Sequence, residues 1–388
     1  MRGLKIVDLT RVLAGPLAVQ QLADQGASVV KIEPPGGDET RAFGPWVDGH
    51  STYFLAANRN KRSIVLDLRT DAGREVLHAL LADADVLVEN FRPGVAERLG
   101  FGWTDLHARY PRLVYVAIRA FGDADSGVPE EWTTRPGYDL VLQAMGGGAS
   151  TTGHPGGPPL KHSLSIADLF SGFLCTQAVL FALLERERTG RTQKIAVNMM
   201  QAQANALAYH ATRALVAHEI EEQRGSAHRG LVPYDLYRCS DGWLALACGN
   251  DGMWRRLVPA LALPDEPRWS TNAGRVADRS AVDAVVTEAL AQLTVAEADQ
   301  RLAAAHVPAG PVLKMDQTLA HPTVQLIATS HAALGTITLP GPAFTTLTTR
   351  EEHDAPPLLG QQRDAVLDAL GYTPDAIADL ARRGAFGG

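Results

Sequence analysis

The sequence predicts an α/β fold organised around a parallel sheet. Through roughly the first 120 residues, short apolar runs alternate with helical patterns, which is typical of strand–helix–strand units. The chain has 388 residues, of which 46% are hydrophobic and 20% are charged, as in ordinary globular proteins. That length is enough for about two domains, each with its own core.

The first strand is expected at residues 4–10 (LKIVDLT). A turn through Ala14, Gly15 and Pro16 leads to a helix that ends near Gly26. Pro16 suits the first helical turn, where its missing N–H costs nothing. This turn reads RVLAGP instead of GxGxxG, so the sheet is not expected to bind a dinucleotide in the usual way. The next strands are expected at residues 29–33, 63–68, 85–90 and 112–118, with a helix at about 71–82.

A long apolar helix is predicted to start at Asp168 and to end at Gly190, a residue that favours helix termination. A helix that is apolar nearly all round is buried in the protein or in a subunit interface. The preceding residues 123–167 are rich in Gly, Pro, Ser and Thr, which indicates loops with one short helix around 138–145. A strand at 193–199 and another long helix at about 199–222 are expected next.

A second unit is predicted to begin near residue 228. It opens with a hairpin that turns at residues 240–242, where Ser, Asp and Gly follow one another. Residues 308–312 (PAGPV) are expected to open a return segment, which leads through a strand-rich stretch as far as Arg350 and into a pair of terminal helices. Between the hairpin and the return segment, helices are expected at residues 253–263, 281–293 and 295–305.

Composition excludes several classes of partner. The net charge of −7 gives no broad basic face, so neither nucleic acid nor an anionic membrane is an expected partner. The three cysteines lie far apart, which argues against disulfides and zinc, and no metal site is expected. The first residues lack the pattern of a signal peptide, and the apolar stretches are interrupted before the length of a membrane span. We therefore expect a cytoplasmic protein.

Asp168 lies where a loop rich in glycine and proline meets the start of the long helix. Aspartate is a favoured N-cap residue, and the simplest interpretation is that its side chain satisfies free N–H groups there. The same place also suits chemistry, because a helix N-terminus favours an anion. On this reading the carboxylate stays ionised and attacks a thioester carbonyl.

A second cluster spans residues 137–153 (GYDLVLQAMGGGASTTG). Its three consecutive glycines permit close approach of the backbone to a ligand, although a flexible turn explains them equally well. Tyr138 and Asp139 are ordinary residues for the start of a helix. Alternatively, the Asp139 carboxylate tunes the pKa of Asp168 or positions the acyl group.

Two polar turns follow predicted strands or precede them, at residues 58–63 and 89–94. Ligands of open α/β sheets bind at the ends of strands. The cations in and near these turns are candidates for phosphate binding, although each one alone is more simply a surface charge: Arg59, Lys61, Arg62, Arg92 and Arg98.

Taken in order, these segments resemble one family closely, the family III CoA-transferases, also called the CaiB–BaiF family. The resemblance covers essentially the whole chain. The segments that carry it are residues 4–16 (LKIVDLTRVLAGP), 29–41, 53–68, 84–94, 137–153, 166–172 (IADLFSG), 185–197, 241–251 and 356–372.

The resemblance implies a large Rossmann-like domain with a parallel sheet, formed by residues 1–222 and completed by 326–388. A smaller α+β domain at residues 228–325 lies between these parts, and two subunits interlock as a homodimer. It also implies that no cofactor is tightly bound, since CoA and acyl-CoA are substrates, with small carboxylic acids as the other partners. A glycine loop that covers the site in some members aligns near Gly249 and is shortened here to CGND.

The resemblance also assigns site residues. The catalytic aspartate of the family aligns with Asp168. Positions that contact CoA align with Leu13, Ala14, Leu66 to Arg69, Asn90, Phe91, Arg92, Arg98, Tyr138 and Asp139.

The implied reaction moves CoA from an acyl-CoA to a free acid through an aspartyl anhydride and an aspartyl-CoA thioester. The alternative on the same fold is an α-methylacyl-CoA racemase, which in the family uses a His–Asp pair. Tyr138 stands here in place of that His, and a tyrosine with an unperturbed pKa of about 10 is a poor base at neutral pH. A catalytically inert CoA-binding protein would have lost Asp168 or the glycines, and a dehydrogenase would need the glycine fingerprint. The sequence does not identify the acids.

Overall fold

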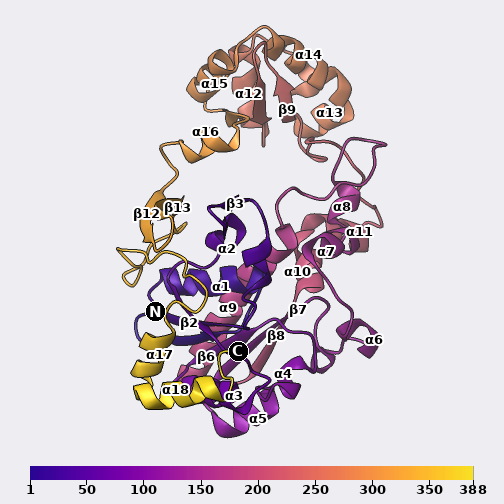
Figure 1. The fold of residues 1–388 in the computed structure, drawn as a ribbon. Helices are drawn as coiled ribbons and strands as arrows, with labels where there is room; N and C mark the ends of the chain where they lie inside the picture. The colour runs from indigo at the N-terminus through magenta and orange to yellow at the C-terminus, as the bar shows by residue number, and fades with distance from the viewer. Residues whose placement is uncertain (388) are drawn as a thin grey trace. The chain divides into compact units, whose positions relative to one another are not determined.

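The computed structural model describes residues 1–387, and its internal contacts divide the chain into two compact units (Figure 1). The first unit comprises residues 1–149, 161–220 and 325–388. The second comprises residues 150–160 and 221–324. Residues 150–160, expected in the large domain, thus group with the smaller unit.

The first unit contains a six-stranded parallel sheet in the order β5-β2-β1-β6-β7-β8. From β1 the chain adds β2 and β5 on one side, and it then returns to add β6, β7 and β8 on the other. The order therefore reverses between β1 and β6, where open α/β sheets form a crevice at the carboxyl ends of the strands. The strands are β1 (Lys5–Asp8), β2 (Ser28–Glu33), β5 (Lys61–Val65), β6 (Val86–Glu89), β7 (Val114–Arg119) and β8 (Lys194–Asn198).

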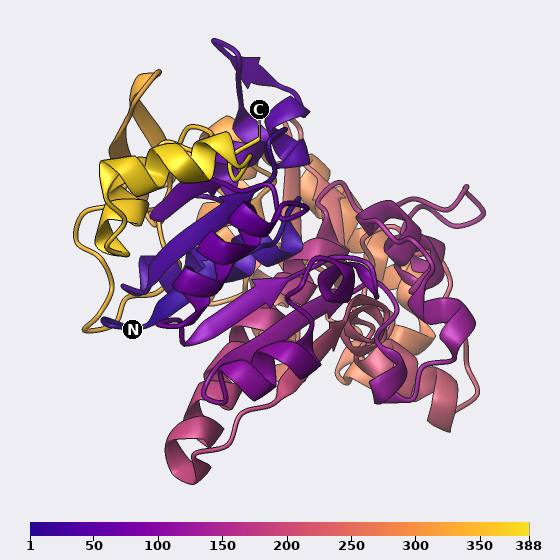
Figure 2. The same ribbon diagram turned by 60° about the horizontal axis from the view of Figure 1, so that its bottom comes forward.

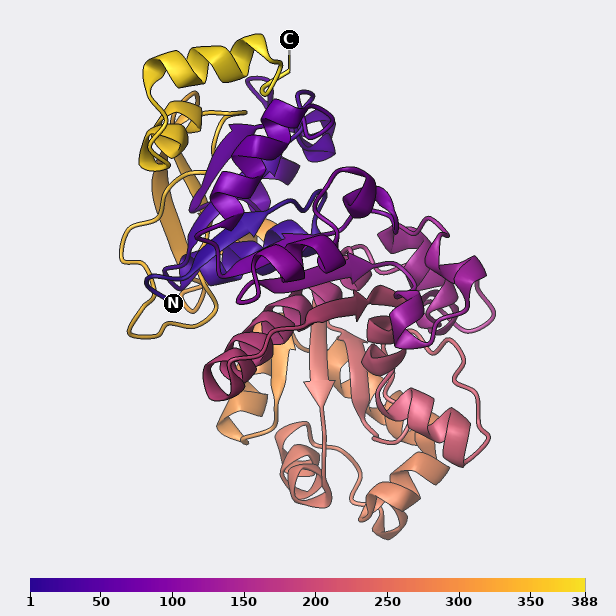
Figure 3. The same cartoon turned by 90° about the horizontal axis from the view of Figure 1, so that it is seen from below.

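Helices cover both faces of this sheet because alternate residues of each strand point to opposite sides. Val7 and Leu87 pack with helices α3 (Asp71–Leu81), α5 (Trp103–Arg109), α17 (Arg363–Ala369) and α18 (Pro374–Arg382). Their neighbours Ile6 and Val86 pack on the other face with α1 (Ala14–Asp24) and α9 (Ile166–Thr189). Figures 2 and 3 show the two layers, with the C-terminal helices in yellow beside the indigo N-terminal strands.

Helix α9 is long and apolar enough to cross a membrane by length and composition, contrary to the expectation that every apolar stretch is interrupted sooner. It packs against α1, α7 (Asp139–Met145), α10 (Met199–Ala206) and β7. Its Asp168 and Arg186 are buried, and Arg186 donates to the Asp85 carboxylate at 2.9 Å. These contacts bury one face of it against the α/β unit.

The helix expected at residues 199–222 is instead two helices, α10 and α11 (Tyr209–Val216). Ala208 between them has a φ of 45°, which no residue of a right-handed helix adopts. The remaining elements of this unit are short: β3 (Trp46–Val47), β4 (His50–Ser51), α2 (Thr52–Ala56), α4 (Val95–Arg98), α6 (Glu130–Thr133), α8 (Gly148–Thr151, shared with the second unit), β12 (Leu326–His331), β13 (Gly335–Pro340), and the 3-10 turns Glu39–Ala42 and Ala124–Ser126.

The second unit packs helices on one face of a three-stranded antiparallel sheet in the order β11-β10-β9. As expected, β9 and β10 form a hairpin, and the Cys239 N–H bonds the Gly242 carbonyl across its turn at 2.9 Å. The PAGPV segment does not open the return, because Ala309–Pro311 pairs with β10 inside this unit. Its elements are β9 (Tyr234–Arg238), β10 (Trp243–Ala247), α12 (Asp251–Ala260), the 3-10 turn Pro267–Trp269, α13 (Asn272–Ala277), α14 (Arg279–Ala291), α15 (Val295–Ala304), β11 (Ala309–Pro311) and α16 (Met315–Leu319).

Candidate active site

A cavity of about 430 Å³ lies at the carboxyl ends of β1 and β6 in the first unit. Residues 11–14 after β1 form one wall, and residues 90–93 after β6 form another. Residues 118–120 and 135–138 also line it, together with Asp168 and with Glu39, Val95, Leu99, Thr133 and Met199. The cavity therefore occupies the point where the strand order reverses, the expected ligand site of such a sheet.

Asp168 reaches this cavity from the first turn of α9. It is the third residue of the helix, and Ser165 is the N-cap, with no capping bond from its own side chain. The interpretation of Asp168 as a simple N-cap is therefore wrong. The cap comes from outside the helix, because Asp139 Oδ1 accepts the Ala167 N–H at 2.9 Å.

Asp139 thus places a second carboxylate beside the nucleophile candidate. Burial, and then the charge of Asp139, raise the pKa of Asp168 to about 7 from an ordinary value of 3.8. The prediction that the helix N-terminus keeps Asp168 ionised is wrong. The Ala167 N–H of that terminus bonds Asp139 instead, and burial disfavours the charged form of Asp168. The prediction that Asp139 tunes the pKa of Asp168 is supported by this geometry.

Gln143, which the sequence analysis missed, holds Asp139 in place. Its Nε2 donates to Asp139 Oδ2 at 2.8 Å and to the Leu164 carbonyl at 3.1 Å. Its Oε1 accepts the His162 N–H at 2.8 Å. One buried amide therefore connects α7 to the loop that enters α9. The only sequence signal for the role of Gln143 was its spacing from Asp139, four residues apart on one helix face.

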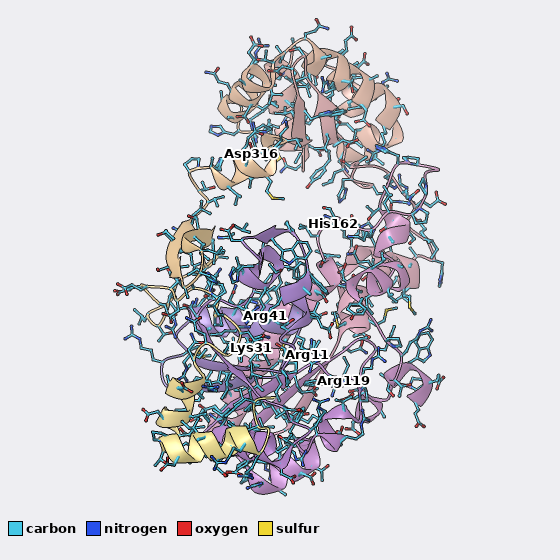
Figure 4. All side chains as sticks on the ribbon, in the orientation of Figure 1. Arg11, Lys31, Arg41, Arg119, His162 and Asp316 are labelled. Atoms are coloured by element: carbon cyan, nitrogen blue, oxygen red, sulfur yellow. The ribbon has the colours of Figure 1, made fainter. Side chains whose placement is uncertain are left out.

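Arg119 is the charged residue on the β7 side of the cavity (Figure 4). Its guanidinium bonds both Glu89 oxygens, at 2.6 and 3.0 Å, and Asp123 at 2.9 Å. Glu89 also accepts the Phe91 N–H at 2.7 Å, which fixes the start of the loop after β6. Arg119 is thus neutralised by its neighbours and offers Asp168 no unpaired cation.

Most predicted CoA contacts lie in two adjoining cavities. Leu13, Ala14, Asn90, Phe91, Arg92 and Tyr138 line the cavity that contains Asp168. Leu66, Leu68 and Arg69 line a second cavity of about 440 Å³, and residues 11, 91 and 99 line both. Arg98 ends α4, and Asp139 faces Ala167 and Gln143, so neither lines these cavities. Contact of all these residues with CoA stays a prediction.

The interpretation of Arg59 and Lys61 as phosphate ligands is wrong. Arg59 bonds Asp24 through two nitrogens, at 2.8 and 2.6 Å. Lys61 is buried and donates to Asp8 and to the Pro16 carbonyl. Both cations serve internal structure. Arg62 donates to Ser28, the first residue of β2. Arg11 and Arg135 do line the cavity, although neither was among the predicted site residues.

Comparison with known proteins identifies the family. The model of CoA-transferase family III matches residues 1–363. The chain belongs to CoA-transferase family III. The family predicted from the sequence is therefore confirmed, and so is the expected enzyme class, an acyl-CoA:carboxylate CoA-transferase of family III.

Relatives of known activity match nearly the whole chain. Succinyl-CoA:glutarate CoA-transferase of Homo sapiens is 33% identical, over 99% of this chain and 89% of its own length. Succinate–glutarate CoA-transferase of Agrobacterium fabrum is 36% identical, over 95% of each chain. A crystal structure of a CaiB/BaiF family protein from Brucella suis superimposes with a TM-score of 0.81 at 34% identity, covering 95% of this chain and 98% of that one.

Replacing Asp139 with Asn should move the pH dependence of the family III transferase. The neutral amide keeps an oxygen for the Ala167 N–H but removes the negative charge beside Asp168. The pKa of Asp168 falls, so the acidic limb of kcat/KM, near about pH 7 in the native enzyme, shifts to lower pH. An acidic limb that stays in place or moves upward contradicts this assignment.

Asp168→Asn should stabilise the fold, and more so at alkaline pH. In the native protein the carboxyl holds its proton up to about pH 7, whereas the unfolded chain releases it near 3.8. Stability from this group is therefore lost as pH rises from the unfolded pKa to the folded one, by roughly 2–4 kcal/mol in all. Thermal melts should show the gain of the variant growing from about pH 4.5 to about pH 8. A gain that is independent of pH would refute the raised pKa.

Proposed function

We propose that this enzyme transfers CoA from an acyl-CoA to a small free carboxylic acid, with Asp168 as the covalent nucleophile. The observation that carries the proposal is a buried carboxylate, with its pKa raised to about 7, at the cavity where the strand order reverses. Its raised pKa marks a group held for chemistry at neutral pH. At and above this pH a large fraction of the carboxylate is ionised and can attack.

The proposed chemistry consists of acyl exchanges. A carboxylate oxygen of Asp168 attacks the thioester carbon of the donor, the C–S bond breaks, and CoA leaves as a thiolate. The thiolate attacks the aspartyl carbonyl of the mixed anhydride, forms an aspartyl-CoA thioester and releases the donor acid. The acceptor carboxylate then attacks this thioester, which forms a new mixed anhydride and releases the CoA thiolate. The thiolate attacks the acyl carbon of that anhydride, which gives the new acyl-CoA and frees the Asp168 carboxylate. Each step exchanges one activated carboxyl for another.

Two N–H groups expected to stabilise the oxyanions are already engaged. The Ala167 N–H donates to Asp139, and the Ile166 N–H donates to the Leu164 carbonyl at 2.8 Å. The proposal therefore assigns no oxyanion role to these two groups. Arg11 and Arg135 line the cavity and are suited to bind carboxylates or phosphates by charge-assisted hydrogen bonds.

We propose small dicarboxylic acids as the first substrates to test. Relatives are named for succinyl-CoA with glutarate, acetyl-CoA with oxalate, and succinyl-CoA with mesaconate. The cations of the cavity wall support acids of this class. We propose that acyl-CoA acts as a substrate, that no cofactor is tightly bound, and that the enzyme works in the cytoplasm.

A homodimer, as the family resemblance implies, is also part of the proposal. Helix α9 exposes large apolar side chains to solvent in the single chain, with Phe173 at 48%, Phe181 at 67% and Leu184 at 57%. A row of such residues on one helix is typical of a subunit interface. Size-exclusion chromatography with light scattering should give twice the monomer mass, and a monomer would refute this part.

The decisive assay mixes the enzyme with succinyl-CoA and a panel of free acids that includes glutarate and oxalate. CoA exchange is expected for the native chain, and Asp168→Asn, freshly prepared to limit deamidation, and Asp168→Ala should lose at least about 1,000-fold. Asp85→Asn serves as the matched control, because Asp85 bonds Arg186 of the same helix and does not line the cavity. Deuterium entry at the α-carbon without CoA exchange would instead identify a racemase.

A further inference from the structure

The loop between β1 and α1 forms one wall of the cavity and contains a strained residue. Val12 has a φ of 67°, in the left-handed region that β-branched residues rarely adopt. Val12 lines the cavity with Arg11, Leu13 and Ala14. A conformation of this kind persists only where the surroundings impose it.

A buried ion pair lies directly behind this loop. Lys31 Nζ and Asp38 Oδ2 are 2.9 Å apart, and both side chains are fully buried. Asp38 Oδ1 accepts the Val12 N–H at 3.3 Å, and Lys31 Nζ donates to the Thr10 carbonyl at 2.7 Å. The pair therefore bonds the backbone on both sides of Arg11. Figure 4 labels Lys31 close to Arg11.

Two further side chains bond the remaining backbone groups of residues 10 and 11. Asn90 accepts the Arg11 N–H at 2.9 Å and donates to the Arg11 carbonyl at 2.8 Å. Asp8 accepts the Thr10 N–H at 2.9 Å. Five consecutive backbone groups, from the Thr10 N–H to the Val12 N–H, are thus bonded by side chains of β1, β2 and the loops after β2 and β6.

The wall that this loop forms is tied closely to the helix of Asp168. Gly172, one turn after Asp168, lies so close to α1 that a Cβ there would come within 2.8 Å of the Ala14 carbonyl. Helix α1 therefore cannot move toward α9 without a clash. A shift of the loop before α1 would change the shape of the cavity opposite Asp168.

We infer that Lys31 and Asp38 are positioning residues, which hold Val12 in its left-handed conformation and thereby shape the wall against which acyl-CoA binds. Neither side chain lines the cavity, so both act through the backbone of residues 10–12. This inference rests on the proposed function. It assigns a role to a charged pair whose burial would otherwise favour its replacement by apolar residues.

The test is the double substitution Lys31→Met with Asp38→Leu, which removes both charges together and leaves no buried ion unpaired. We expect KM for the acyl-CoA to rise at least about 10-fold while kcat changes less than about 3-fold, because binding geometry is lost and Asp168 is intact. Adding Val12→Gly should bring KM most of the way back to the native value, since glycine adopts a positive φ without strain.

The matched control is Arg59→Met with Asp24→Leu, which removes another buried ion pair of the same unit that does not line this cavity. It should change the melting temperature by a similar amount and leave KM unchanged. If the Lys31/Asp38 variant does not fold, Lys31→Gln with Asp38→Asn keeps polar groups in the space and should raise KM at least about 3-fold.

An unchanged KM in the folded variant, a similar KM increase in the control, or no recovery with Val12→Gly would each overturn the inference. Titration calorimetry with CoA separates it from the proposed function. A native enzyme that exchanges no CoA would refute the proposed function. Weaker CoA binding by the Lys31/Asp38 variant, recovered by glycine, would still support the positioning role.

Discussion

Buried charges at the carboxyl edge of the sheet are the constraint on which the rest of the structure depends. Strands β1, β2 and β6 end in Asp8, Glu33 and Glu89, and each of these carboxylates is buried. Each accepts an N–H from the loop that follows its strand, on Thr10, Asp38 and Phe91 respectively. Buried carboxylates of this kind are paired with cations, and replacing a buried ion pair with apolar residues often costs nothing in stability. Their value here is geometric, because the loops that they fix are the walls of the cavity.

The nucleophile, Asp168, differs from these carboxylates in its electrostatic environment. Asp168 is buried and forms no ion pair within residues 1–387, and the neighbouring charge that shifts its pKa is that of the like-charged Asp139. This arrangement destabilises the fold at neutral pH but keeps the carboxyl near the point where it ionises. Cations line the same cavity, and those that are buried there are already paired with carboxylates. The site therefore combines a frame of paired buried charges with one buried acid whose ionised form is disfavoured.

Much of the sheet could be predicted from the sequence, because apolar runs and turns are local signals. The strand at residues 29–33 and the short helix around 138–145 followed from pattern alone, and the strand expected at 63–68 is found slightly earlier, at Lys61–Val65. Asp168 stood out only through the order of the family segments, since a lone aspartate at a helix start is ambiguous.

The remaining features depend on contacts between distant residues. No local pattern indicated that Asp139 caps α9 from another helix, or that Val12 would adopt a positive φ. Lys61 was considered as a surface charge or a phosphate ligand, and both interpretations are wrong, because its burial depends on Asp8, which lies 53 residues earlier in the chain. The break at Ala208, where φ is 45°, was missed because alanine favours helices and no helix-breaking residue marks the position.

The central claim is that the Asp168 carboxyl becomes an activated ester during turnover, and trapping that ester tests it most directly. The enzyme would be incubated with an acyl-CoA and hydroxylamine, digested and analysed by mass spectrometry. A hydroxamate on the side chain of Asp168, dependent on acyl-CoA and absent from Asp139, is the expected result. An unmodified Asp168 peptide from an enzyme that is actively exchanging CoA would contradict the claim.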